Sequence, residues 1–541
     1  MLADDMAKLS LSDDEKKMPH LPNEILNEIF SHHQLPSVCQ IGRDRYEGLN
    51  IHKGPLIRTG PIADYVDNDL HTGACTHEHG DYKAKLHTLS AISKVSRNWY
   101  KVALPFMYAV YPGQTVVQPK LFLRSIKKNP DLAPLVKQMV VDPWDALNVS
   151  KKFRNAVDSA ALQELPNILD RLAEEWNDEA HAALLLLRCT EIESLTFVLP
   201  SYYDADLGVF SLLKKIRQAE SNARTQKQDA TKKHSSLTEL PLRKVKQLFI
   251  HHAEHHYIRD LKGAYSLMRL SSVDSVTVYR FWDGATMLKG LQHLKSLTLW
   301  RNSFKPDDLL KALDTCTSLR SLNIMFAGFR SILGRLVPED KRIDMNELGK
   351  IIRMKLTSLR DLRLDDREQD PPKPYIFPSL RRGPPLEKLA INEAALGCYT
   401  GRRMPDIPLA DMLPESLQSL AILRSNQWWH EADRGPRGEE YTGDDGVTYR
   451  FHAIHDKIVD FLHNGQANCP QLKEIYLDTP MKFGKKVKHF GWKIEKAVGA
   501  EVLERPSVVV GPLVQPKDKK EWEKTQVERS GKAAVVLRRI E

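Results

Sequence analysis

The chain lacks long hydrophobic runs and has few cysteines, and both absences remove classes of protein. No apolar stretch reaches the roughly 20 residues that a membrane-spanning helix requires. The start, Met1-Leu-Ala-Asp-Asp, is acidic and carries no apolar core, so we expect no secretory signal peptide. The six cysteines among 541 residues are scattered and form no Cys-x-x-Cys pair, unlike a disulfide framework. We therefore predict an intracellular protein, cytoplasmic or nuclear or both, that does not bind a membrane.

The sequence also lacks the motifs of the common enzyme classes. It has no Gly-x-Gly-x-x-Gly after a strand-like run, no phosphate-binding loop ending in Lys-Ser or Lys-Thr, and no Gly-x-Ser-x-Gly. The segment His251-His-Ala-Glu-His255 fits the pattern His-x-x-Glu-His of inverted zinc proteases. That chemistry needs the two histidines on one helix, whereas this segment directly follows an expected strand. We predict a histidine-rich surface turn here, and a non-catalytic protein with no cofactor.

A second group of metal-ligating side chains lies in residues 71–79, where three histidines and Cys75 fall close together. Zinc prefers four nitrogen or sulfur donors in a tetrahedron, and residues 75, 77 and 79 would share a face only on an extended strand. The spacing fits no zinc-finger pattern. We favour a polar loop without a metal ion, with a structural zinc site as the alternative.

The charge balance is basic, with 79 lysines and arginines against 70 aspartates and glutamates, a net charge of +9. A basic balance favours acidic partners, including nucleic acid. Here the cations are spread through the chain, often beside acids, which is typical of solvated faces. We expect general attraction to acidic partners and no dedicated nucleic-acid site.

An apolar pattern, Leu-x-x-Leu-x-Leu, occurs ten times at intervals of 21 to 56 residues. The last two apolar residues of each copy share one face of a short strand, and the first belongs to the turn before it. One unit cannot bury its apolar side alone, so units stack and share a core. The pattern resembles leucine-rich repeats, and an unrelated α/β core with buried parallel strands is the alternative. The copies begin at Val136, Ile192, Val245, Val273, Leu294, Leu319, Leu359, Leu386, Leu417 and Leu472.

Two amphipathic segments precede these copies. In the first, apolar residues from Leu21 to Phe30 fall on one helical face, with Pro22 in the first turn. In the second, apolar residues from Leu86 to Val102 recur every three or four positions. Neither helix is long enough to be stable alone. Packed together, they could present an apolar surface to a partner.

These segments resemble an F-box of the fungal type. The resemblance rests on Leu-Pro-x-x-Ile-Leu-x-x-Ile-Phe, starting at Leu21, and on Val-Ser-Arg-x-Trp, starting at Val95. It implies docking on the Skp adaptor of a cullin-RING (SCF) ubiquitin ligase, with the rest of the chain selecting a protein substrate. A usual F-box is contiguous, whereas here a predicted loop at residues 31–85 interrupts it. The residues implied in docking are Leu21, Pro22, Ile25, Leu26, Ile29, Val95 and Trp99.

The predicted organisation is therefore an α/β protein in four parts. A disordered tail (1–18) precedes an F-box helical module (19–111), an irregular leucine-rich-repeat solenoid of short parallel strands alternating with helices (112–480), and a basic extension or cap (481–541). The exposed strand side chains would line a concave substrate surface, on which we expect Tyr279, Trp300 and Arg363 to act. A repeat scaffold for a protein or nucleic-acid partner, without a ligase role, is the alternative function.

Overall fold

We describe the protein from a computed structural model. It describes residues 22–31, 76–113, 117–141, 151–174, 178–199, 208–228, 240–252, 265–279, 291–302, 306–326, 345–365, 377–396, 399–401, 407–423, 440–442, 448–451, 454–477, 492–496 and 535–539. These residues form two compact units, and the division falls within strand β5, after Val276.

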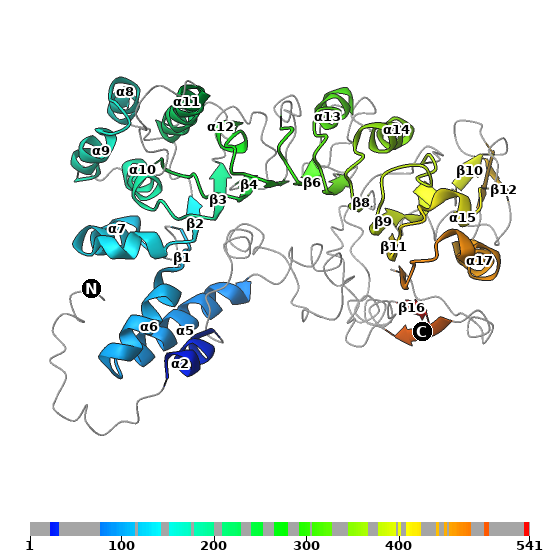
Figure 1. Cartoon of the computed structure of the whole chain (residues 1–541), viewed down its shortest axis with the longest axis horizontal. Helices are drawn as coiled ribbons and strands as arrows, with labels where there is room; N and C mark the ends of the chain where they lie inside the picture. The colour runs from blue at the N-terminus through cyan, green and yellow to red at the C-terminus, as the bar shows by residue number, and fades with distance from the viewer. Residues whose placement is uncertain are drawn as a thin grey trace, which may run out of the picture. The chain divides into compact units, whose positions relative to one another are not determined.

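The first unit combines parallel strands with the helices that precede and follow them in the chain (Figure 1). Its strands follow chain order in the sheet, and the pairs β1–β2, β2–β3 and β3–β4 are parallel. The strands are β1 (Val110–Tyr111), β2 (Gln138–Val141), β3 (Ser194–Leu199), β4 (Gln247–His252) and the start of β5 (Ser275–Tyr279). The helices are α2 (Asn23–Ser31), α5 (Thr76–Ser93), α6 (Arg97–Tyr108), α7 (Pro119–Lys128), the 3-10 helix η2 (Pro130–Leu135), α8 (Lys151–Ser159), α9 (Leu165–Glu174), α10 (Asp178–Arg188), α11 (Gly208–Gln228) and α12 (Tyr265–Met268).

The second unit continues the same alternation of strand and helix. Its parallel strands, in sheet order, are β6 (Ser296–Asn302), β7 (Ser321–Phe326), β8 (Asp361–Asp365), β9 (Lys388–Asn392), β11 (Ser419–Leu423) and β14 (Glu474–Leu477). Two antiparallel strands, β16 (Val535–Arg539) and β15 (Trp492–Lys496), then end the parallel series. A separate antiparallel sheet holds β10 (Tyr399–Gly401), β13 (Thr448–Phe451) and β12 (Glu440–Thr442). The helices are α13 (Pro306–Leu313), α14 (Met345–Lys355), η7 (Glu393–Leu396), α15 (Leu409–Met412), α17 (Ile454–Asp460), the π-helical η8 (Phe461–Gly465) and η9 (Gln466–Asn468).

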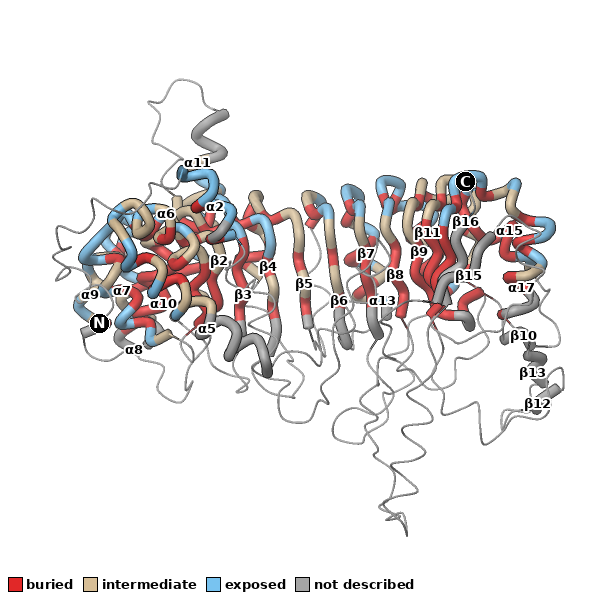
Figure 2. The backbone as a smooth tube through the Cα atoms, turned by 90° about the horizontal axis from the view of Figure 1, so that it is seen from below, coloured by how far each residue is buried: buried red, intermediate tan, exposed pale blue. Residues whose placement is uncertain are grey.

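All ten Leu-x-x-Leu-x-Leu segments form strands, as predicted, and each strand begins two residues after the first apolar position. The first apolar side chain of every copy is at most 1% exposed. The two apolar residues within each strand are also buried, and Figure 2 shows the strands as a series of buried segments. The α/β architecture with parallel strands is thereby confirmed, because the copies share a core through their neighbours.

The repeat has a further regular position, three residues before the first apolar residue, which the sequence pattern did not include. In eight copies within the described residues, the N–H of the first apolar residue donates to a carbonyl oxygen three residues earlier, closing a turn. A buried residue occupies that earlier position in most copies, for example Leu242 and Leu291. Cys189, Cys316 and Cys469 hold the same place and are at most 1% exposed. The described cysteines are therefore repeat residues of the core.

One local expectation differs from the structure. Helix α5 begins at Thr76, within the predicted loop, so His77 and His79 lie on a helix and not on the extended strand that a shared metal face would need. The remaining insertion, the tail and most of the basic extension lie outside the described residues.

The core of the helical module includes residues of the first strands. Its hydrophobic cluster joins α2, α5 and α6 to Val110 of β1 and Val140 of β2, which are each 2% exposed. The three helices and the first strands therefore share one core. This packing explains how short helices persist, since tertiary contacts supply most of the stability of a short helix.

Candidate partner-binding surfaces

The two halves of the F-box-like motif meet at their amino-terminal ends. The side-chain amide of Asn98 in α6 donates to the amide oxygen of Asn23 in α2 over 3.0 Å. Ser96 caps α6, because its hydroxyl accepts a hydrogen bond from the Trp99 backbone N–H at 3.2 Å. Segments that are far apart in sequence are thus held side by side at this end of the module.

The interior of the module is aromatic and tightly packed. Leu26 and Phe30 of α2 are fully buried. The ring of Phe30 meets Trp99 edge to face at 6.2 Å and stacks on Phe106 at 5.9 Å between ring centroids. Leu26 was expected at the docking surface, whereas in this structure its side chain is buried in the core of the module. Trp99 is partly buried, and its contact with Phe30 makes it a wall of that core.

Three exposed apolar residues lie outside this core, in or next to the helices α2 and α6, and we refer to them together as the helix-end patch: Pro22, Ile25 and Val95. Pro22 is exposed, Ile25 is 47% exposed and Val95 is 36% exposed. Along the chain, Ile25 lies two residues after Asn23, and Val95 lies three residues before Asn98, the two residues that the hydrogen bond joins. Of the other predicted docking residues, Leu21 lies outside the described residues, as does the side chain of Ile29.

On the strand face predicted to hold a substrate, Arg363 is the candidate residue whose side chain the structure describes, and this side chain is buried. Arg363 Nη2 lies 3.1 Å from Asp365 Oδ2, and both side chains are 1% exposed. Arg363 is therefore part of a buried ion pair and not a free contact residue. Tyr279 ends β5 and Trp300 lies in β6, as expected, but their side chains are outside the described part of the chain.

Other polar side chains on the same strand positions are buried as well. Thr196 of β3, Asn323 of β7 and Ser419 of β11 are 1%, 8% and 5% exposed. Within the described residues, their side-chain oxygens have no hydrogen-bond partner. Asp361 pairs in register with Lys388 on the next strand; burial raises the pKa of Asp361, and the Lys388 charge opposes that shift. The alternating charges of Asp361, Arg363 and Asp365 were the sequence signal of this polar row.

The described residues contain no cluster of three histidine, cysteine, aspartate or glutamate side chains able to hold a metal ion. The group at residues 71–79 falls largely outside these ranges. His251 lies in strand β4 and not on the helix that a zinc protease would require, and the rest of that motif after residue 252 is not described. None of the helices in the described ranges is both long enough and apolar enough to cross a membrane.

No protein-family model matches the chain, and no curated protein matches it significantly.

Proposed function

We propose that the protein is a non-catalytic substrate receptor of an SCF-type cullin-RING ubiquitin ligase. The helix-end patch is the observation that carries the proposal. In the described residues only four large apolar side chains are exposed, namely Ile25, Val95, Leu121 and Met354. Two of them, Ile25 in α2 and Val95 in the turn before α6, belong to the segments whose motifs resemble an F-box. Exposed apolar groups gathered in one place are typical of protein–protein contacts.

In this proposal each part of the chain has its own role. The helix-end patch docks on the Skp adaptor, which links the chain to the cullin. The strand-and-helix array binds a protein substrate, with Tyr279 and Trp300 as candidate contacts. The receptor contributes no chemistry and raises the effective concentration of substrate lysines near the charged ubiquitin carrier.

The test is adaptor binding by the full-length chain. We expect Ile25→Asp and Val95→Asp each to weaken binding of the purified Skp adaptor at least about tenfold, because a charge at the centre of an apolar interface must be desolvated. Leu121→Asp is the matched control, since Leu121 is 44% exposed but lies on α7. Binding is measured by isothermal titration calorimetry at two salt concentrations.

Equal effects of all three substitutions, or no binding by the native chain, would remove the docking role. Apolar docking changes little with salt, whereas phosphate contacts weaken steeply. Circular dichroism of each variant verifies that the helices are retained. Because the substituted residues are exposed, we expect their thermal midpoints to stay close to that of the native chain.

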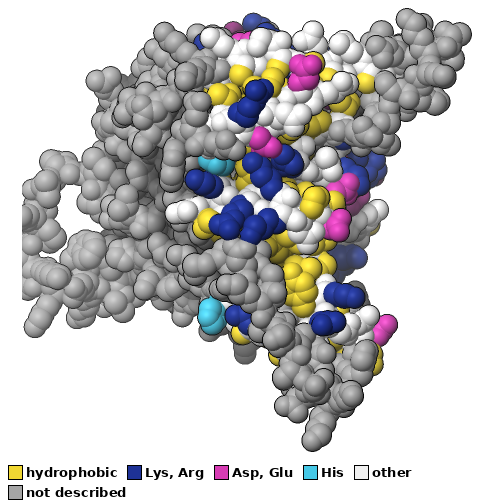
Figure 3. All heavy atoms as spheres, turned by 90° about the vertical axis from the view of Figure 1, so that its left-hand side faces the viewer, with side chains coloured by type: hydrophobic (Ala, Val, Ile, Leu, Met, Phe, Trp, Pro, Cys, Tyr) yellow, Lys and Arg dark blue, Asp and Glu magenta, His cyan; other side chains and the backbone are white. Residues whose placement is uncertain are grey.

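A scaffold that binds an acidic partner is the second candidate, and helix α7 favours it. The helix carries four exposed cations and no acidic residue: Lys120, Arg124, Lys127 and Lys128. Asp170 of α9 offsets part of this charge, at 2.9 Å from Lys127. Figure 3 shows Lys and Arg side chains gathered on this side of the molecule. A strong salt dependence of partner binding, lost on neutralising α7, would favour this candidate.

A further inference from the structure

The residues that immediately precede the strands of the second unit form a row at the N-terminal ends of these strands. The backbone N–H of Arg320 donates to the Lys295 carbonyl oxygen at 2.7 Å, and that of Arg360 to the Arg320 carbonyl oxygen at 2.8 Å. Three consecutive members of the row are therefore cations, on strands spaced by about 4.8 Å. Like charges at neighbouring strand positions are destabilising, so an anion bound beside Arg320 and Arg360 would offset the repulsion between these two side chains.

The chain neutralises this row only in part. Glu387, the next member of the row, forms an ion pair with Arg360, in which Arg360 Nη1 lies 3.3 Å from Glu387 Oε1. Within the described residues, the Arg320 guanidinium has no such partner, and the side chain is exposed. Two guanidinium groups against one carboxylate leave one positive charge at this place.

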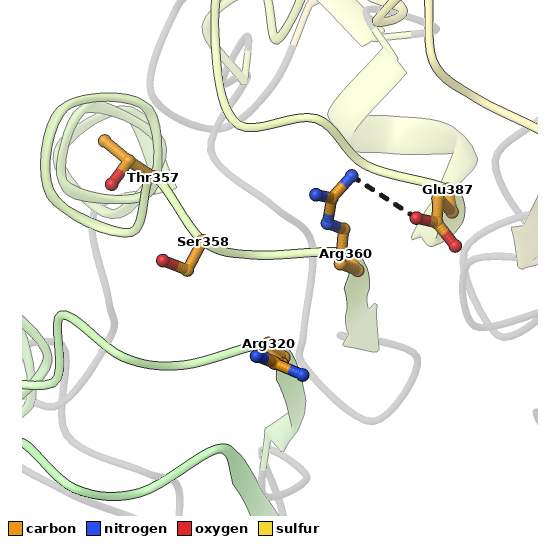
Figure 4. A pocket seen from close by; sticks show the side chains of 5 residues that line it. All are labelled: Arg320, Thr357, Ser358, Arg360 and Glu387. Atoms are coloured by element: carbon orange, nitrogen blue, oxygen red, sulfur yellow. Dashed lines mark hydrogen bonds and ion pairs between the residues drawn. The ribbon is translucent and has the colours of Figure 1, made fainter.

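A hollow of about 500 Å³ lies at the same place, in front of β7, β8 and β9. It is lined by Arg320, Arg360 and Glu387 from the row and by Thr357 and Ser358 from the turn before β8. Figure 4 shows the Arg360 guanidinium turned toward Glu387, while Arg320 stands apart from that pair on the neighbouring strand. The lining thus includes the Arg320 guanidinium, with its five N–H donors, and the hydroxyl groups of Thr357 and Ser358. No apolar residue is among the five that line the hollow.

We propose that this hollow binds a carboxylate side chain of an acidic peptide segment in a protein partner. A guanidinium fork matches a carboxylate in a two-point contact. One carboxylate balances the single positive charge, whereas a phosphate dianion would overbalance it beside Glu387. The lining has no aromatic ring for a base to stack on, which disfavours single-stranded nucleic acid. The site is separate from the helix-end patch, so it does not depend on the proposed ligase role.

The test uses the full-length protein and a short fluorescein-labelled peptide of alternating glutamate and glycine, followed by fluorescence anisotropy. We expect Arg320→Gln to weaken binding at least about tenfold, the loss typical of one charge-assisted contact. We expect Glu387→Gln to tighten binding, because it removes the carboxylate that competes for Arg360. Arg320→Lys keeps the charge but loses the fork, so its effect is smaller than that of Arg320→Gln.

Lys473→Gln is the matched control. Lys473 is exposed and belongs to the same row, its N–H donating to the Gln418 carbonyl oxygen at 2.9 Å, three strands beyond Arg360 in the sheet order. Unchanged binding by this variant supports the site. Equal weakening by Arg320→Gln and Lys473→Gln would reduce the effect to net charge and overturn the proposal. Equal binding of a glutamine–glycine peptide would also overturn the proposal. A labelled single-stranded oligonucleotide is the second probe: if Arg320→Gln weakens binding of the oligonucleotide but not of the acidic peptide, the proposal is overturned as well.

Discussion

At the scale of single residues, the same side-chain type serves opposite purposes on the two sides of a strand start. Arg360 lies just before β8 and keeps about half its side chain in water, while Arg363 lies within β8 and is 1% exposed. An exposed ion pair contributes little because water and salt screen it. A buried pair has lost its hydration and depends on its partner. The identity of the residue says nothing about which role applies.

The buried pair gives a stability prediction. We expect Arg363→Met to lower the free energy of unfolding by about 3 to 5 kcal/mol, because it leaves Asp365 buried without its charge partner. The double variant Arg363→Met with Asp365→Leu should recover much of this loss. Urea denaturation followed by circular dichroism provides the measurement.

The matched comparison is Arg360→Met, which breaks the exposed pair with Glu387 and should cost less than about 1 kcal/mol. A loss for Arg363→Met as small as that for Arg360→Met would show that Arg363 is not buried as described.

At the scale of elements, helix α2 places one apolar residue in the core and leaves another exposed to a possible partner. Neighbouring residues on a helix point about 100° apart, so Leu26 enters the core while Ile25 stays at the surface. The apolar periodicity correctly placed a helix here. It merged the two residues into one docking face, because periodicity does not tell a face that meets the chain's own core from one that awaits a partner.

This division predicts separable effects on stability and binding. Leu26→Ala should lower the free energy of unfolding of the first unit by about 2 to 5 kcal/mol, since it leaves a cavity beside Phe30 and its aromatic neighbours. Ile25→Ala should change stability by less than about 1 kcal/mol and act on adaptor binding alone. Denaturant titration of the two variants, compared with their adaptor affinities, distinguishes these effects. Similar stability losses would contradict the assignment of Leu26 to the core.

At the scale of the whole molecule, one small turn recurs through both units. In most copies the residue three positions before the first apolar residue is buried; it is leucine in several copies and cysteine at 189, 316 and 469. Burial raises the pKa of the Cys189 thiol to about 12 and those of Cys316 and Cys469 to about 11. Since the thiolate is the nucleophile, these thiols are protected twice, by low ionisation near neutral pH and by lack of access.

We therefore expect these three cysteines to resist alkylation in the native protein. Iodoacetamide at pH 8, followed by peptide mass spectrometry, should leave them unmodified while the chain is folded. In concentrated urea their pKa values return to the ordinary range and all three should react at similar rates. Rapid native labelling of any one would show that its repeat opens or that the residue is not in the core.

The sequence by itself determined the strands, because a short strand with its turn is a local pattern and ten copies of it reinforce one another. It also predicted helix α2, whereas the single helical face expected from Leu86 to Val102 is divided between α5 and α6 by a turn at residues 94–96. None of the described helices is long and apolar enough to span a membrane. Only the tertiary structure decided that Leu26 and Arg363 are buried and that Ile25, Val95 and Arg320 are exposed. Burial depends on which segments pack against a side chain, and those segments are distant along the chain.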